Sequence, residues 1–220
     1  MISEQGDAGA LSGPAARTSA AEAANKVAAV TVSFWIAKVL FTTVGDLSGD
    51  ALSITLGLGY EFALAVALVV FLALLHVQLR ATRFIPWLYW LVLLSSSAVG
   101  AEISDSIDRA LHWGSRYGTL ALLLCTVLIL AAWFAHRGAL GSVPVNDRRD
   151  ERYYWLAAIS ANSLGSAFGD LIGGWHGWGL MGGIAVNLAI LALLIVLHYT
   201  TGVSKGLLFW TAFVVTRIPF

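Results

Sequence analysis

Charged and hydroxyl-bearing side chains recur every four residues in one early segment of an otherwise apolar chain. They are Lys38, Thr42, Asp46 and Asp50. In an α-helix, residues four apart lie on the same face, so these side chains form one polar stripe. Such a stripe can bind a cation, carry a proton or hold an internal ion pair. We expect Lys38 to pair with Asp46, directly or through Thr42 or water, unless Lys38 is a charge that moves during transport.

Two later segments carry acidic and polar side chains in a matching pattern. These positions are Ser97, Glu102 and Asp105 in the second segment and Asn162, Ser166 and Asp170 in the third. Together with the first stripe, all of these except Ser97 form the candidate ion-binding set. Asp46 and Glu102 lie deeper in their segments than the terminal aspartates, so we expect these two to be the main ligands of a cation or proton.

The stripes belong to a repeat that aligns without gaps at residues 34–50, 89–105 and 154–170. Each copy begins with an aromatic residue and a Trp; a Gly follows the Trp after ten residues and an Asp after fifteen. The Trp positions are Trp35, Trp90, Trp155 and, in a fourth copy that stops before its Gly, Trp210. This spacing indicates duplication. Because the Trp residues recur in register, we expect them to pack between helices.

Seven segments read as membrane-spanning helices, each of which needs about 20 mostly apolar residues. They are residues 27–47, 60–79, 86–103, 117–134, 153–172, 180–199 and 206–220. The chain is 58% hydrophobic and 12% charged, and a soluble domain carries about twice that charged fraction. We therefore predict an all-α integral membrane protein of about seven transmembrane helices and exclude a soluble enzyme. The zero net charge indicates no basic face for nucleic acid.

The helices are organised as tandem two-helix repeats within one transmembrane domain, residues 26–220. The repeats cover about 27–80, 84–137 and 150–200, with a partial one at 206–220. Residues 1–25, rich in Ala, Ser and Gly, predict a flexible tail. Lys and Arg gather in this tail and in the loops after the second, fourth and sixth helices, whereas the other loops hold only Arg109 and Arg116. The positive-inside rule therefore predicts a cytoplasmic N-terminus and places the repeated aspartates at the outward end.

Small residues lie four apart near the acidic end of the first helix of each repeat. The pairs are Gly45 with Gly49, Gly100 with Ser104, and Gly165 with Gly169. Such pairs let helices approach closely, so we assign these glycines to packing. Because the polar stripes lie on the odd-numbered helices, we expect those helices to form an inner ring and the even-numbered helices to face lipid.

The repeated aspartates occupy an electrostatically unfavourable place. The negative end of the helix dipole disfavours a carboxylate there by ~0.3–1 kcal/mol, and an ionised Asp costs a further ~2.5–3.5 kcal/mol at the centre of a bilayer. Asp50, Asp105 and Asp170 are therefore either hydrated just beyond the membrane or part of a convergent site for a cation or proton. In the fourth copy, Arg217 takes the position of Thr42, where it can neutralise the acidic ring or bind an anion.

Three stretches resemble a known family: FWIAKVLFTTVGDLSGDALS near the start, the YYW…LG…GDL copy, and LFWTAFVVTR at the end. The chain resembles, over about residues 27–220, the bacterial "uncharacterised membrane-anchored protein" family of tandem repeats of unknown function. The resemblance implies two transmembrane segments and a Trp in each repeat, and a location in the bacterial inner membrane; it implies no reaction. Asp46 stands where many members have Glu. Members usually continue after Thr-Arg with Pro-Leu-Gly and a Gly-Asp pair, so the resemblance predicts an eighth helix that this sequence does not contain.

The repeated acidic placement favours a secondary transporter or exchanger of a small inorganic cation, without a cofactor. Two other classes stay open. One is a non-catalytic membrane sensor partner or assembly protein. The other is an intramembrane metal-dependent lipid hydrolase, in which His112 and His176 would join nearby carboxylates. The expected partners are the lipid bilayer, a cation or proton and a second copy of the chain, because the partial repeat leaves its helix unpaired.

Overall fold

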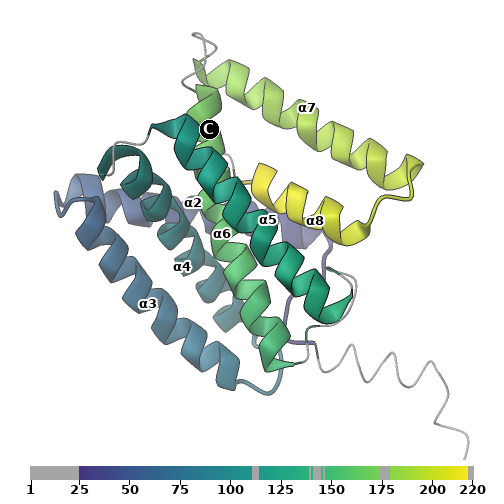
Figure 1. Cartoon of the computed structure of the whole chain (residues 1–220). Helices are drawn as coiled ribbons and strands as arrows, with labels where there is room; N and C mark the ends of the chain where they lie inside the picture. The colour runs from purple at the N-terminus through teal and green to yellow at the C-terminus, as the bar shows by residue number, and fades with distance from the viewer. Residues whose placement is uncertain are drawn as a thin grey trace, which may run out of the picture.

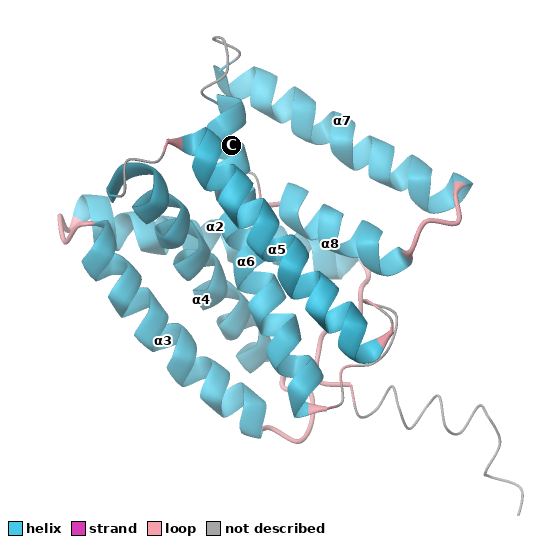
Figure 2. Cartoon of the chain, in the orientation of Figure 1, coloured by secondary structure: helices cyan, strands magenta, loops and turns pink. Residues whose placement is uncertain are grey.

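Helices make up almost all of the part of the chain that the structure describes (Figure 2). The computed structural model describes residues 25–110, 114–138, 140, 145, 147–173 and 179–217. The α-helices in this part are α2 (Val32–Asp50), α3 (Tyr60–Arg80), α4 (Pro86–Asp105), α5 (Ser115–Arg137), α6 (Arg148–Gly173), α7 (Gly179–Thr200) and α8 (Lys205–Val215). Each of the seven segments predicted to be helical is helical. The predicted flexible tail, 1–25, lies outside the described residues except for Asn25.

Three helix boundaries differ clearly from the prediction. Helix α6 begins at Arg148 rather than at residue 153. Helix α2 begins at Val32 rather than at residue 27, because the Thr31 side chain accepts a hydrogen bond from the Phe34 amide (3.2 Å) and caps the helix there. Helix α8 ends at Val215, and Thr216 and Arg217 form a turn, so the predicted helix to residue 220 was too long. Residues 218–220 lie outside the described part of the chain.

Among the described residues, three helices are long and apolar enough to cross a membrane: α3, α5 and, from Met181, α7. They are the second helices of the first three repeats. Helices α2, α4 and α6 carry the polar stripes or charged ends, and α8 has only 11 residues. The prediction of about seven spans is therefore confirmed for three helices by length and composition, and for the others it stays a prediction.

The helices form two layers (Figure 1). Helices α4 and α6 are buried along most of their length, whereas only 22%, 28% and 6% of the spans in α3, α5 and α7 are buried. Helix α3 packs on α4, α5 on α6, and α7 on α8. Each second helix thus covers the first helix of the next repeat. We call α2, α4, α6 and α8 the inner helices and α3, α5 and α7 the outer helices, which agrees with the predicted arrangement.

The repeated glycines set the contact between successive inner helices. A Cβ added at Gly45 would lie 2.7 Å from the Ser97 Cβ, one at Gly100 would lie 2.8 Å from the Asn162 Cβ, and one at Gly165 would lie 2.6 Å from the Arg217 Cβ. In the three complete copies, the Gly ten residues after the Trp thus packs against the residue seven after the next Trp. These contacts agree with the packing role predicted for Gly45, Gly100 and Gly165.

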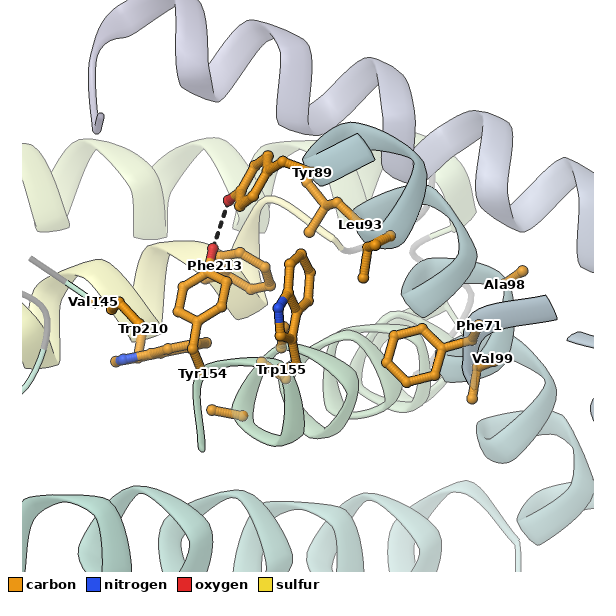
Figure 3. Close-up of a cluster of buried hydrophobic side chains, with 14 of the residues drawn as sticks. Phe71, Tyr89, Leu93, Ala98, Val99, Val145, Tyr154, Trp155, Trp210 and Phe213 are labelled. Carbon is orange, nitrogen blue, oxygen red and sulfur yellow. Dashed lines mark hydrogen bonds between the residues drawn. The ribbon is translucent and has the colours of Figure 1, made fainter. Parts of the chain in front are cut away.

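The aromatic pairs that open the repeats contact one another in a closed ring at the end of the inner helices opposite the repeated aspartates. Figure 3 shows part of this ring, with Tyr89, Tyr154, Trp155 and Trp210. The contacts, with the distances between ring centroids, are Phe34 with Trp90 (5.8 Å), Tyr89 with Trp155 (5.5 Å), Tyr154 with Trp210 (5.7 Å) and Phe209 with Phe34 (6.1 Å). The hydroxyl groups of Tyr89 and Tyr154 are hydrogen-bonded at 2.6 Å. The last contact joins the fourth copy to the first, so the four copies enclose a common centre.

Two π-helical segments extend inner helices directly after the repeated aspartates. They are η1 (Ala51–Thr55), which follows Asp50, and η2 (Ser106–Ala110), which follows Asp105. The sequence pattern did not predict them. A π-turn is rare and is found frequently at functional sites, and here both occur at the same place in two repeats.

Candidate functional site

The polar stripe of α2 faces the other inner helices, as predicted. Lys38 and Thr42 are fully buried, and Asp46 and Asp50 are half-buried. The opposite side of α2 is apolar and exposed, with Ile36 among its residues. The stripe therefore lies on the inside of the helix bundle and not on the exposed apolar side of α2.

Lys38 holds the end of α8. Its Nζ donates to the Phe213 carbonyl (2.6 Å) and to Thr216 Oγ1 (2.8 Å), and it lies 4.3 Å from the centre of the Phe213 ring. A cation is favourable where a helix exposes its last carbonyls. The predicted direct pair of Lys38 with Asp46 is wrong, because these acceptors take the ammonium group and another cation reaches Asp46.

That cation is Arg217, from the turn after α8. Its Nη1 donates to Asp46 Oδ2, and its Nη2 donates to the Ser97 carbonyl (3.2 Å). The other oxygen of Asp46 accepts from Ser97 Oγ at 2.9 Å. Arg217 is buried, and its planar guanidinium can bond to two acceptors at once, which an ammonium group does less well. The expectation that Arg217 neutralises part of the acidic ring thus agrees with the geometry.

Glu102 is the most isolated acid of the set. The residue is 0% exposed, and neither of its carboxylate oxygens accepts a hydrogen bond. It faces Gly49 of α2, where an added Cβ would lie 2.9 Å from Oε1. The Ser53 hydroxyl, which lies near Glu102, donates to the Gly49 carbonyl (3.1 Å). A buried carboxylate without a partner is costly, so this group favours a bound proton or a bound cation.

The terminal aspartates complete what we call the acidic end of the bundle. Asp50, Asp105 and Asp170 are all half-buried and come from three different inner helices. Asp105 interacts electrostatically with Asp50 and with Arg109, whose Nε lies 3.6 Å from its carboxylate, and Asp170 interacts with Asp105. Half-burial places these groups at the border between bulk water and the interior of the bundle.

The hydrogen bonds of the described residues do not join Asn162 or Ser166 to the carboxylates. Asn162 is fully buried; its Nδ2 donates to Ser96 Oγ (3.1 Å), and its Oδ1 has no partner. Its Cβ meets Gly100 in the contact between α4 and α6. Ser166 is also buried, in the same helix. Asn162 thus belongs first to helix packing, with one free acceptor.

A second polar network, at the opposite end of the bundle, was missed in the sequence. Lys26 Nζ lies 2.9 Å from Glu151 Oε2, and Gln78 Nε2 donates to Glu151 Oε1 (3.0 Å). All three side chains are buried. Sequence reasoning counted Lys26 only as a charge that orients the chain, and nothing in the local pattern indicates a partner 125 residues away.

Metal-binding residues do not gather in the described ranges: no group of three His, Cys, Asp or Glu side chains there is placed to hold a metal ion. His112 and His176, which the hydrolase alternative requires, lie outside the described residues. Cys125 is exposed.

The first repeat matches a known family model. Residues 33–84 match the family model described as a Repeat of Unknown Function (DUF347). This stretch holds nearly all of α2, then η1 and α3, which together make one two-helix repeat. No curated protein and no solved structure matches the chain. The match agrees with the predicted repeat family over this stretch and carries no activity.

Proposed function

We propose that this chain is a multi-pass protein of the bacterial inner membrane that transports or exchanges a small inorganic cation. The observation that carries the proposal is the acidic end. Acidic side chains from α2, α4 and α6 converge there, and one of them, Glu102, is fully buried without a hydrogen-bond partner. A ligand that neutralises Glu102 would account for a buried acid without a partner.

The membrane arrangement follows from the two layers. The outer helices α3, α5 and α7 cross the bilayer and shield the more polar inner helices from lipid. Arg80 and Arg137, at the ends of α3 and α5, mark the cytoplasmic side. The acidic end then faces outward, and the N-terminus is cytoplasmic. Repeats inserted in the same direction are related by an axis along the membrane normal, so a pathway along the centre of the inner helices is the natural one.

The chemistry of the site suits a hard cation. Carboxylate, backbone carbonyl and hydroxyl oxygens are the ligands that such ions prefer. Asp46 and Ser97, which are hydrogen-bonded to each other, supply these groups between α2 and α4, and Glu102 adds a buried carboxylate further along α4. Protonation of Glu102 would compete with cation binding, so a proton is the natural counter-ion of an exchanger at this site.

Flux measurements on the Glu102→Gln variant test this function. Purified protein in proteoliposomes would be assayed with a panel of monovalent and divalent cations under an imposed pH gradient. Because neither Glu102 oxygen accepts a hydrogen bond, Gln breaks no contact of the fold. Selective flux in the wild type that is lost in Glu102→Gln supports the proposal. The matched control is Glu61→Gln, an acid-to-amide change on the exposed start of α3, which should leave flux intact.

A second candidate function is that of a non-catalytic assembly protein. It is favoured by the exposed apolar side of α2, which includes Ile36, Leu40 and Val44. Helices α4, α6 and α8 each carry an outer helix from the preceding repeat, and no described helix packs along this side of α2. We take a second copy of the chain as its partner. Loss of a dimer in lipid nanodiscs on Leu40→Ala, but not on Leu193→Ala of α7, would support this reading; a monomeric wild type would oppose it.

A further inference from the structure

The guanidinium group of Arg217 lies among oxygen atoms of the kind that a cation would use. We propose that it occupies the cation position at the acidic end and acts as a tethered competitor that the transported ion must displace. This inference rests on the proposed function and assigns the regulation of the same site. In this role Arg217 does not coordinate the ion; it controls when Asp46 is available to bind it.

The first argument is the set of atoms around the guanidinium. Its donors meet the Asp46 carboxylate and the Ser97 carbonyl, while Ser97 Oγ donates to Asp46 and to the Thr42 carbonyl (2.8 Å). A carboxylate, two carbonyls and a hydroxyl thus converge on a small volume between α2 and α4. These oxygens would suit an alkali or alkaline-earth ion if the guanidinium were absent.

The second argument is the register of the repeat. The residue seven after the Trp is Thr42, Ser97 and Asn162 in the first three copies, and only Arg217 at this position carries a charge. Gly165 packs against the Cβ and Cγ of Arg217, at 2.6 and 2.7 Å from the position of an added Cβ. The Arg217 side chain therefore starts in the turn after α8 and packs its Cβ and Cγ against α6. Its guanidinium group reaches α2 and α4.

The third argument is that the guanidinium has other acids to move to. It interacts electrostatically with Asp50 and Asp170 as well as with Asp46, and its Nε has no hydrogen-bond partner. Asp50 lies one helical turn from Asp46. In the proposed exchange, Arg217 releases Asp46 to an incoming cation and remains within the electrostatic field of Asp50 and Asp170.

Lys38 holds the backbone next to Arg217 in place while the guanidinium group moves. Its bonds to the Phe213 carbonyl and to Thr216 hold the last turn of α8 against α2, next to the point where Arg217 begins. The two buried basic side chains thus have different roles. Lys38 anchors the end of α8, and Arg217 occupies the cation site. Alternating occupancy by Arg217 and the ion favours exchange over open conduction.

Equilibrium binding to the purified full chain tests the inference. Na⁺, K⁺, Mn²⁺ and Ca²⁺, each alone, would be titrated into the wild type, Arg217→Gln and Asp46→Asn with Arg217→Gln. Gln keeps the Cβ and Cγ that pack on Gly165 and removes the charge. We expect the Kd of the bound ion to fall by about tenfold or more in Arg217→Gln, because a nearby like charge is removed, and binding to be lost in the double variant.

The outcomes separate this inference from the proposed function. Binding to the wild type with an unchanged or higher Kd in Arg217→Gln overturns the competitor role and leaves the transporter standing. Binding of no ion to either protein overturns the proposed function itself. If Arg217→Gln does not fold, Arg217→Lys carries the test: its ammonium cannot bond to Asp46 and the Ser97 carbonyl as a fork, so the Kd should still fall, and an unchanged Kd contradicts the inference.

Discussion

Gly49 of α2 and Glu102 of α4 face each other across the contact between these helices, and the carboxylate of Glu102 lies in the space that the missing side chain of Gly49 leaves. The two positions belong to different repeats. The space exists because Gly49 is the second member of a small pair, four residues after Gly45, which lets α2 and α4 approach closely. The glycine that allows the close packing of α2 and α4 therefore also provides the space that the Glu102 carboxylate occupies.

Gly49→Ala tests this relationship. The new methyl group would meet Glu102 Oε1 at 2.9 Å, and the end of a flexible side chain can move away, so we expect the free energy of unfolding to change by less than about 1 kcal/mol. Cation flux should fall, because the carboxylate is displaced. Gly173→Ala is the matched control, since an added Cβ there meets nothing within 4 Å. Equal flux in both variants would separate Gly49 from the site.

Gly100→Ala should act on stability instead. Its Cβ would lie 2.9 Å from the backbone nitrogen of Ser163, which cannot move without moving α6. Overpacking of this kind costs about 1–3 kcal/mol. Thermal unfolding in detergent measures the loss, and Gly183→Ala, whose nearest neighbour is 4.0 Å away, serves as the comparison. An unchanged melting temperature for Gly100→Ala would contradict the close contact of α4 with α6.

Lys38→Met should loosen the end of α8. Met fills a similar volume but leaves the Phe213 carbonyl without its donor, which costs about 1–3 kcal/mol for a buried acceptor. We expect faster hydrogen exchange in α8 and little change in α3. Lys205→Met, at the exposed start of α8, is the control. Equal exchange rates in the wild type and in Lys38→Met would show that Lys38 does not hold α8.

The hydroxyl pair in the aromatic ring predicts a non-additive result. Tyr89→Phe leaves the Tyr154 hydroxyl buried without its partner and should cost about 1–3 kcal/mol. The double variant with Tyr154→Phe should lose less than the sum of the two single changes, because both polar groups are gone. Unfolding of the four proteins gives the coupling energy, and additive losses would mean that the bond contributes nothing.

The helices and their polar faces could be predicted because both depend on local spacing. Apolar segments of sufficient length gave the seven helices, and the interval of four from Lys38 to Asp50 gave the buried face of α2. The repeat also placed Gly45 correctly in a helix contact, because small residues four apart have one main structural use.

The partners of the charges could not be predicted in the same way. Arg217 reaches Asp46 across 171 residues, and the choice between it and Lys38 depends on how the fourth inner helix closes on the first. Local spacing favoured Lys38, which lies on the same helix face, but the carbonyl groups at the end of α8 bind it instead. The π-helical turns after Asp50 and Asp105 likewise have no signature in the apolar pattern.

The central claim, that the acidic end binds and moves a cation, is tested most directly by isotopic counterflow in proteoliposomes. Vesicles loaded with one unlabelled cation would be diluted into a trace of its isotope, with the wild type and with an Asp46→Asn, Asp170→Asn double variant. We predict transient uptake of the isotope by the wild type and none by the double variant. Equal uptake by both proteins would contradict the role of these carboxylates, and no uptake of any cation by folded wild-type protein would contradict the transporter itself.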